Sequence, residues 1–337
     1  MCSMRLSDCE LLVIYCPASP RILLRHVERP VRDVSASSRY NRKLHHHASL
    51  RTHPLHMHAQ SGAPQPEGPQ TIPGIKSIIA VGSGKGGVGK TTLAVNLALA
   101  LARLGHKVGL LDADIYGPNV PLMLGETGEP QLTPENLIVP AERYGLKVIS
   151  VGYLNPGDKP LVWRGPMLHG VIKQFLSQVA WGELDYLIID LPPGTGDVVI
   201  SLTQSVPLTG AVVVTTPSDV SLQDARKAIE MFNQVNVELL GIVENMSYMV
   251  CPHCNHEIDV FSTGGGERTA TQYGVPFLGR IELDPTIRQG GDSGHPVVLG
   301  GEQANNAKSL FAFARKVLAR AEEVKASGGS SGVLSID

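Results

Sequence analysis

The segment at residues 84–91, GKGGVGKT, constrains the fold of this chain more than any other feature because it matches the phosphate-loop pattern completely. In such a loop the backbone N–H groups converge on phosphate oxygens, which requires the conformational freedom of glycine. An apolar run at residues 75–81 precedes the loop, and a helical pattern at 92–104 follows it. Strand, loop and helix N-terminus in this order predict that the chain binds a nucleotide polyphosphate.

Two side chains of this loop have defined expected roles. Lys90 is expected to contact the β- and γ-phosphates, and the Thr91 hydroxyl to join the coordination shell of Mg²⁺. The alternative is a glycine-rich turn that binds nothing, which the complete motif in this setting disfavours. The predicted nucleotide-binding residues of the loop are Gly84, Lys85, Gly86, Gly87, Val88, Gly89, Lys90, Thr91 and Thr92.

Strand-like and helix-like segments alternate through the rest of the chain. The strand-like runs are residues 107–111, 146–154, 186–189, 211–215 and 239–243, and helical patterns cover 166–180 and 219–235. This alternation predicts an α/β fold with a doubly wound, mostly parallel sheet, helices on both faces, and the ligand at the strand carboxyl ends. A last helix is predicted to pack on the core through one apolar face, formed by Leu310, Ala314, Val317, Ala321 and Val324.

Three aspartates follow the predicted strands at the edge where a phosphate-loop ATPase needs them. Asp112 and Asp114 come just after the second strand, and Asp190 closes a hydrophobic strand in the manner of a Walker B aspartate. Such an aspartate holds Mg²⁺ through a water molecule. A single aspartate after a strand is more often a helix cap or a turn residue. Three of them converging on a phosphate loop favour the functional interpretation.

Composition restricts the class of protein. The chain has 337 residues with 42% hydrophobic content, which suits one large α/β domain, predicted for residues 71–326. A formal charge of −2 gives no general attraction to nucleic acid or anionic membrane, so neither is an expected partner. No apolar run is long enough to span a bilayer. Five cysteines do not make a disulfide framework in a chain of this size and favour a reducing compartment.

The two ends of the chain differ in composition from the rest. Residues 1–70 are arginine-rich, contain three consecutive histidines at 45–47, and predict a disordered leader. They resemble an organelle transit peptide weakly, because Asp8 and Glu10 lie where such peptides avoid acids. A mis-assigned start, with translation beginning at Met57, is the other interpretation. Residues 327–337, rich in serine and glycine, predict a flexible tail.

A second informative motif is Cys251-Pro252-His253-Cys254. Two thiolates can hold one soft metal, but they are half of the four sulfur ligands that zinc or a [4Fe–4S] cluster normally takes. A two-fold dimer with this loop at its axis would bring four thiolates to one bridging cluster. Two alternatives remain. His253 or His256 could complete a mononuclear zinc site, or the cysteines could be a redox pair.

Six motifs in order give the chain a close resemblance to a known family. They are GKGGVGKTT, DADIYGPNVP, WRGP, DYLIIDLPPGTGD, ENMSYMVCPHC and LGRIELDPTIRQGGDSGHP. From about residue 75 to about 321 the sequence resembles the Mrp/ApbC family of iron–sulfur cluster carrier ATPases, in the deviant Walker A group that includes MinD and the nitrogenase iron protein. The resemblance implies a homodimer that binds ATP, holds a [4Fe–4S] cluster between subunits, and passes it to apo-proteins.

The resemblance also implies roles for single residues. Lys85 looks like the signature lysine that reaches the partner's phosphates, and Asp114 like the aspartate that orients the attacking water. These two and Lys90 are the predicted catalytic residues. The other implied roles are Asp112 near Mg²⁺, Asn245 at adenine, and Cys251 and Cys254 as cluster ligands. ATP is then expected to act as a conformational switch, hydrolysed slowly.

The sequence also leaves open two other functions and two cellular compartments. A MinD-like or partition-like positioning ATPase would need a terminal basic amphipathic helix or a basic patch, for membrane or DNA. A thiol–disulfide enzyme is a third interpretation. The expected partners are apo iron–sulfur proteins and cluster assembly factors, although a small accessory domain found in many bacterial relatives is not recognisable. The expected compartment is the cytoplasm, or the mitochondrial matrix if residues 1–60 are a transit peptide.

Overall fold

The computed structural model describes residues 71–126, 130–154 and 165–328. The chain divides into two units, Met1–Glu67 and Gly68–Asp337, and the structure described below belongs to the second. The predicted leader at 1–70, with Met57 and the histidine run, lies outside the described residues, as does the tail from residue 329 onward. The domain boundaries therefore stay predictions. Among the described helices, none is long and apolar enough to cross a membrane.

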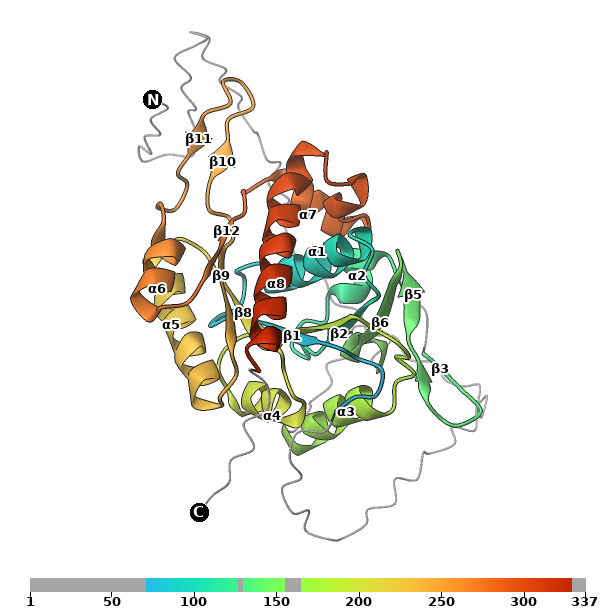
Figure 1. The fold of residues 1–337 in the computed structure, drawn as a ribbon. Coiled ribbons are helices and arrows are strands. Elements are labelled where there is room, and N and C mark those ends of the chain that lie inside the picture. Colours follow the sequence, from blue (N-terminus) through green and yellow to red (C-terminus); the bar gives the residue numbers. More distant parts are fainter. Residues whose placement is uncertain (1–70, 127–129, 155–164, 329–337) are drawn as a thin grey trace, which may run out of the picture. The chain divides into compact units, whose positions relative to one another are not determined.

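An eight-stranded sheet forms the centre of the described unit, in the order β12-β9-β8-β1-β7-β2-β6-β5 (Figure 1). All neighbouring pairs are parallel except β5 with β6. The strands are β1 (Ile78–Gly82), β2 (Val108–Asp112), β5 (Ala141–Arg143), β6 (Leu146–Ser150), β7 (Tyr186–Asp190), β8 (Gly210–Thr215), β9 (Leu239–Glu244) and β12 (Phe277–Arg280). The central strands are apolar up to their carboxyl ends because both faces of a parallel sheet are covered.

Helices cover both faces of the sheet, and alternate residues of each strand point into two separate cores. From β1, Ile79 and Val81 join the core on one face, whereas Ile78 and Ala80 join the core on the other. The first face carries α1 (Lys90–Arg103), α2 (Val120–Leu124), α7 (Pro285–Asp292) and α8 (Lys308–Ala326). The second face carries α3 (Gly165–Ser177), α4 (Asp197–Ser205), α5 (Asp219–Gln234) and α6 (Gly265–Tyr273).

Smaller elements extend from this framework. Two short antiparallel pairs lie apart from the main sheet: β3 (Gln131–Leu132) with β4 (Ile138–Val139), and β10 (Met249–Val250) with β11 (Glu257–Ile258). Figure 1 shows the β10–β11 hairpin projecting beyond the sheet near β9 and β12. Three 3₁₀ turns, η1 (Val151–Leu154), η2 (Val297–Gly300) and η3 (Asn305–Ala307), complete the described elements.

The predicted fold class is confirmed, and the predicted bounds of several elements differ from the observed ones, of which two differences have a clear local cause. The strand predicted for residues 146–154 ends at Ser150, because the Ser150 hydroxyl accepts a hydrogen bond from the Gly152 amide at 2.9 Å and turns the chain into η1. The helix predicted for 166–180 ends at Ser177, because the next residues pair with Ile138 through backbone hydrogen bonds. The predicted apolar face of the last helix is buried along its length.

Candidate functional site

The phosphate-loop segment connects β1 to α1, as the sequence predicts. Gly87 and Gly89 adopt φ values of 79° and 83°, a region that side-chain-bearing residues avoid. Gly89 is the N-cap of α1, and the Leu93 amide donates to its carbonyl at 3.0 Å. The first N–H groups of α1 have no partner within the helix and face the loop, which makes a binding site for an anion.

Two glycines of the loop are required by close packing. A Cβ added to Gly84 would lie 1.9 Å from the backbone carbonyl oxygen of Asp224 in α5. A Cβ on Gly89 would lie 2.2 Å from Nδ2 of Asn245. Gly86, in contrast, has open space where its Cβ would be. The backbone of the loop is therefore wedged against α5 on one side and Asn245 on the other.

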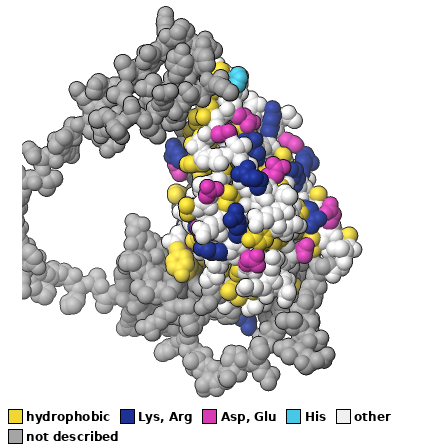
Figure 2. Space-filling view, turned by 90° about the vertical axis from the view of Figure 1, so that its left-hand side faces the viewer, with side chains coloured by type: hydrophobic (Ala, Val, Ile, Leu, Met, Phe, Trp, Pro, Cys, Tyr) yellow, Lys and Arg dark blue, Asp and Glu magenta, His cyan; other side chains and the backbone are white. Residues whose placement is uncertain are grey.

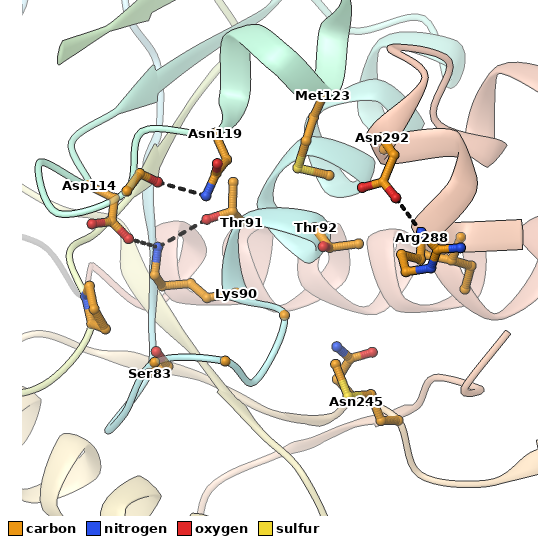
Figure 3. A pocket seen from close by; sticks show the side chains of 18 of the residues that line it. Ser83, Lys90, Thr91, Thr92, Asp114, Asn119, Met123, Asn245, Arg288 and Asp292 are labelled. Carbon is orange, nitrogen blue, oxygen red and sulfur yellow. Dashed lines mark hydrogen bonds and ion pairs between the residues drawn. The ribbon is translucent and has the colours of Figure 1, made fainter. Parts of the chain in front are cut away.

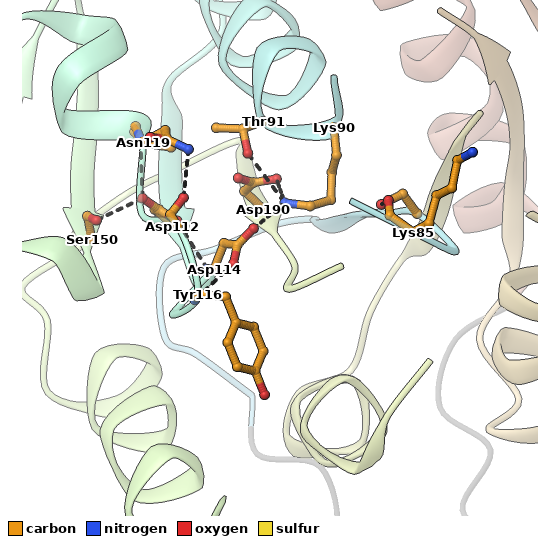
Figure 4. Close-up of polar contacts among 12 residues, drawn as sticks. Lys85, Lys90, Thr91, Asp112, Asp114, Tyr116, Asn119, Ser150 and Asp190 are labelled. Carbon is orange, nitrogen blue, oxygen red and sulfur yellow. Dashed lines mark hydrogen bonds and ion pairs between the residues drawn. The ribbon is translucent and has the colours of Figure 1, made fainter. Parts of the chain in front are cut away.

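Lys90 lies at the centre of the polar cluster, between the carboxyl ends of β2 and β7 (Figure 4). Its Nζ is 2.6 Å from Oδ1 of Asp190 and 3.3 Å from Oδ2 of Asp114, and it donates to the Thr91 hydroxyl at 3.4 Å. Lys90 and Asp190 are buried, and Asp114 nearly so. The structure thus brings together four residues that the sequence predicted for this site, and the Lys90 ammonium offsets part of the charge of the two carboxylates.

Asp112 lies beside this cluster, but its oxygens are bonded elsewhere. Oδ2 accepts from the Ser150 hydroxyl at 2.8 Å and from the Val120 amide at 3.3 Å, and Oδ1 accepts from the Asp114 amide at 3.1 Å. Asp112 therefore anchors the segment between β2 and α2 that carries Asp114. Ser150 is a supporting residue that sequence reasoning missed, because nothing in the strand pattern marks which residue of a neighbouring strand faces Asp112.

Burial controls the ionisation of the two innermost carboxyls. Burial, and then the charge of Asp190, raise the pKa of Asp112 to about 7, and the Ser150 hydrogen bond opposes that rise. Burial also raises the pKa of Asp190, against the opposing charge of Lys90. Among the described groups, Oδ2 of Asp190 has no hydrogen-bond partner. An incoming cation would find an unused carboxylate oxygen there.

A cavity of about 660 Å³ extends from this cluster (Figure 3). Ser83, Lys90 and Asp114 lie at one end, and Arg288 and Asp292 of α7 lie at the other. The volume is suitable for a nucleotide. The α7 wall was not predicted residue by residue, although its motif was part of the family resemblance. The lining residues that sequence reasoning missed include Met123, Met246, Glu282, Leu283, Asp284, Ile287, Arg288 and Asp292.

Asn245 and Lys85 occupy different parts of this site. Asn245 follows β9, lines the cavity, and donates from Nδ2 to the Val88 carbonyl of the loop at 2.8 Å. The Lys85 side chain is half-buried and points away from the Lys90 cluster (Figure 4). Within the described part of the chain its ammonium has no ion-pair partner, so it is available to a phosphate group or to another molecule.

Cys251 and Cys254 lie in the turn of the β10–β11 hairpin and do not line the cavity. The Cys251 amide donates to the His256 carbonyl, and the Asn255 amide to the Cys251 carbonyl, each at 2.9 Å. Cys251 is buried and Cys254 half-buried. Among the described residues, no three His, Cys, Asp or Glu side chains are grouped to hold a metal ion. The cysteines follow a short strand and do not lie at the start of a helix, which is where a helix N-terminus would lower the pKa of a redox-active thiol.

Comparison with known families decides the classification. The model for the ParA family, described as NUBPL iron-transfer P-loop NTPase, matches residues 74–318. This chain belongs to that family. The match covers the phosphate loop, the three aspartates, Asn245 and the cysteine hairpin.

Individual members of the NUBPL-type NTPase family are also similar over most of their length. An iron-sulfur cluster carrier protein of Synechocystis sp. is 52% identical, over 74% of this chain and 72% of that protein. The iron-sulfur cluster transfer protein NUBPL of Mus musculus is 47% identical, over 74% of this chain and 79% of that protein. An iron-sulfur protein of Arabidopsis thaliana, named as mitochondrial and required for NADH dehydrogenase, is 48% identical, over 75% of this chain and 81% of that protein.

Solved structures place this NUBPL-type NTPase among nucleotide-binding proteins. A nucleotide-binding protein of Archaeoglobus fulgidus, in complex with ADP, has a TM-score of 0.58 and 41% identity, over 65% of this chain and 87% of that chain. The cell division ATPase MinD of Pyrococcus furiosus has a TM-score of 0.54 and 26% identity, over 72% of this chain and 99% of that chain. Similarity to MinD is therefore weaker than similarity to the cluster carriers.

Proposed function

We propose that this protein is an ATP-dependent carrier that holds a [4Fe–4S] cluster and transfers it to apo-proteins. The observation that carries the proposal is the presence, in one chain, of a complete phosphate-binding pocket and a separate pair of thiols that lacks further metal ligands among the described residues. The names of relatives near 50% identity, iron-sulfur cluster carrier proteins, support the same function.

ATP would bind with its phosphates over the loop and its base toward α7. Residues 84–92 would surround the phosphates, and Asn245 would contact the adenine end. The residues fit Mg²⁺, because the Thr91 hydroxyl, Asp114 and the unpartnered Oδ2 of Asp190 offer the oxygen ligands that this ion prefers. Bound Mg²⁺ would neutralise phosphate charge. The hydrogen bonds that occupy Asp112 favour an anchoring role for this residue over contact with the ion.

Hydrolysis would use groups from two protomers. Asp114, held in place by Asp112, would orient the water that attacks the terminal phosphate, and Lys90 would stabilise the developing charge. Lys85 points away from its own cluster, which supports a role at the phosphates of a partner protomer (Figure 4). Nucleotide binding would then alter how two copies dock.

The cluster would be cargo shared between two chains. Each chain offers Cys251 and Cys254, and a [4Fe–4S] cluster takes four thiolates. A homodimer with the two hairpins at its axis would supply all four. Recipients would be apo iron–sulfur proteins, with assembly factors as donors. The cytoplasm is the proposed compartment, and the relative named as mitochondrial keeps the matrix as the alternative.

Anaerobic reconstitution with iron and sulfide tests this function. We expect about four irons per dimer, with the absorbance of a [4Fe–4S] cluster, in the unaltered protein. Cys251→Ser and Cys254→Ser should each abolish cluster binding while ATP binding persists, because the cysteines lie outside the cavity. Full loading of a monomer would refute the shared-cluster arrangement. A protein that binds zinc and no iron, and that loses the zinc on His253→Ala or His256→Ala, would support the mononuclear zinc alternative.

A MinD-like positioning ATPase is the second candidate, since MinD shares the fold. On the face shown in Figure 2, basic side chains are interspersed with acidic ones and do not gather into one patch over the described residues. The described part of this face therefore offers no concentrated positive charge to DNA or to an anionic membrane. ATP-dependent co-sedimentation with vesicles or DNA would favour this candidate over cluster transfer.

A further inference from the structure

A buried carboxylate lies directly next to the nucleotide-contacting asparagine. Glu244, the last residue of β9, is 0% exposed and precedes Asn245, which contacts the phosphate loop. Glu244 accepts from the Ser247 hydroxyl and from the Gly266 amide of α6, each at 2.5 Å. Two donors hold this carboxylate in a fixed position, so the segment from 244 to 247 is held against the end of β9 and α6.

Arg280, at the end of β12, joins this segment to the cysteine hairpin. Its Nε donates to the Ser247 hydroxyl at 2.9 Å, and its Nη1 is 3.3 Å from Oε2 of Glu257 in β11. Its guanidinium also stacks on the Tyr248 ring, 4.5 Å from the ring centre, just before β10. One side chain therefore contacts the residue just before β10 and the first residue of β11.

The hairpin register places these contacts close to the thiols. Glu257 pairs with Val250, and Cys251 is the next residue. A series of links therefore runs from the Val88 carbonyl to Asn245, and from its covalent neighbour Glu244 through Ser247 to Arg280. Arg280 then contacts Glu257 in β11, which pairs with Val250 next to Cys251. These links lie within one chain and do not need the partner protomer.

We propose that Arg280 is a positioning residue that transmits nucleotide occupancy at Asn245 to the Cys251–Cys254 turn within a single protomer. This inference rests on the proposed carrier function and deepens it. The inner links are buried, whereas the Arg280–Glu257 pair is at the surface, with the Glu257 side chain 54% exposed. Among the described atoms, Nη2 of Arg280 is buried without a partner. The outer pair is the link that can open, because the Glu257 carboxylate is exposed and can bind water in place of Arg280.

Guanidinium chemistry explains why arginine is required at this position. The planar group donates to Ser247 and Glu257 in different directions while its face covers Tyr248. A lysine ammonium is a point charge that cannot make the three contacts together. Arg280→Lys should therefore behave like a loss of the link, although it keeps the charge.

Thiol reactivity provides the test. The reduced, full-length protein without cluster is alkylated at Cys251 and Cys254, with and without a non-hydrolysable ATP analogue and Mg²⁺, at a dilution where its mass is that of a monomer. We expect the analogue to change the alkylation rate of at least one cysteine about fivefold or more. In Arg280→Gln and Arg280→Lys, the ratio of the alkylation rate with the analogue to the rate without it should be close to one. The affinity of both variants for the analogue should stay within about twofold of that of the unaltered protein.

Two further variants separate this effect from misfolding. Glu257→Gln removes the surface pair without touching the buried links, and should also reduce the ratio. Arg315→Gln removes an exposed arginine of α8 that has its own ion pair to Glu302, and it should leave the ratio unchanged. An unchanged ratio in Arg280→Gln, or no effect of the analogue on the unaltered protein, would overturn the inference. Loss of analogue affinity in Arg280→Lys would overturn it too, because Arg280 would then serve the pocket itself.

Iron content distinguishes the failure of this inference from the failure of the carrier function. Arg280→Gln should still load iron and sulfide to the level of the unaltered protein, since both cysteines remain. If the unaltered protein loads no cluster, the carrier function fails. The thiol ratio would still report whether the two sites communicate.

Discussion

Gly84 is the position where a single methyl group should do the most damage to the loop. Its Cβ would meet a backbone oxygen of α5 at 1.9 Å, and a backbone atom cannot rotate away. We expect Gly84→Ala to lower the free energy of unfolding by about 1–3 kcal/mol, as overpacking does in well-packed interiors. Urea unfolding followed by circular dichroism measures the change.

Gly86→Ala is the matched control for this prediction. Gly86 lies two residues further along the same loop, and its added Cβ would meet no atom within 4 Å. Its free energy of unfolding should stay within about 1 kcal/mol of the unaltered protein. Equal unfolding midpoints for the two variants would show that the loop does not pack against α5 in solution.

Asp112 predicts a specific pH dependence of stability in the protein without nucleotide. Burial and Asp190 raise the pKa of its carboxyl from 3.8 to about 7 in the folded state. The folded state therefore binds this proton more tightly than the unfolded state does. Stability should fall as the pH rises from about 4 to about 7 and then level off with respect to this group.

Asp112→Asn should flatten that pH profile because an amide does not ionise. The slope should decrease without disappearing, since burial also raises the pKa of Asp190. Unfolding midpoints in urea, measured between pH 4 and pH 8 without nucleotide, compare the two proteins. A variant with the same slope as the unaltered protein would contradict the assignment of this titration to Asp112.

At the scale of elements, α8 should contribute strongly to stability through its buried aromatic residues. Phe313 is 1% exposed in the core on the α1 face of the sheet. We expect Phe313→Ala to cost about 3–5 kcal/mol of folding free energy. Phe261→Ala, at a side chain that is 51% exposed, should stay within about 0.5 kcal/mol. Thermal unfolding of both variants checks this, and similar melting temperatures would contradict it.

The sequence predicted best the strands that are buried on both faces and the helices that bury a continuous apolar stripe along one side. β1, β2, β7, β8 and β9 appear in the sequence as continuous apolar runs because helices cover both sides of them. α7 was not predicted, because its sequence PTIRQGGD contains two glycines, which are poor helix formers. Those glycines are needed where the helix packs, since a Cβ on Gly290 would meet the His295 carbonyl at 2.8 Å.

The site was predictable where its residues are neighbours in sequence or end adjacent strands. The loop, Asp114 and Asp190 follow from motif spacing and from the convergence of parallel strands. Ser150, Arg280 and Arg288 could not be predicted, because their roles depend on contacts between segments distant in the chain. Asp112 shows the same limit: its position was predicted, but its bonds to Ser150 and Val120 were not.

At the scale of the whole molecule, the position of Lys85 predicts that two copies of the protein cooperate in ATP hydrolysis. We expect Lys85→Ala to bind ATP with near-normal affinity as a monomer, since its ammonium points away from the Lys90 cluster. Steady-state hydrolysis at concentrations that favour the dimer should fall on the order of a hundredfold, because a charge at the partner's phosphates is lost. Equilibrium binding of ATP measures the affinity, phosphate release measures the hydrolysis rate, and the mass measured in parallel gives the oligomeric state.

Lys308→Ala is the control for this prediction, because Lys308 is exposed at the start of α8 and bonds locally to Asn305. It should hydrolyse ATP at the unaltered rate. Normal hydrolysis and normal cluster delivery by Lys85→Ala would refute a role for this lysine across the dimer.

The position of Lys90 between two carboxylates has a consequence for which anions the protein accepts. An anion entering the pocket competes with Asp190 at 2.6 Å and Asp114 at 3.3 Å for the same ammonium. A small oxyanion such as phosphate or sulfate can bind the loop amides, but it brings no cation to the carboxylates that would lose Lys90. A polyphosphate accompanied by a divalent counterion satisfies both demands. A polyphosphate that arrives with its divalent counterion should therefore bind more tightly than a small oxyanion that enters without one.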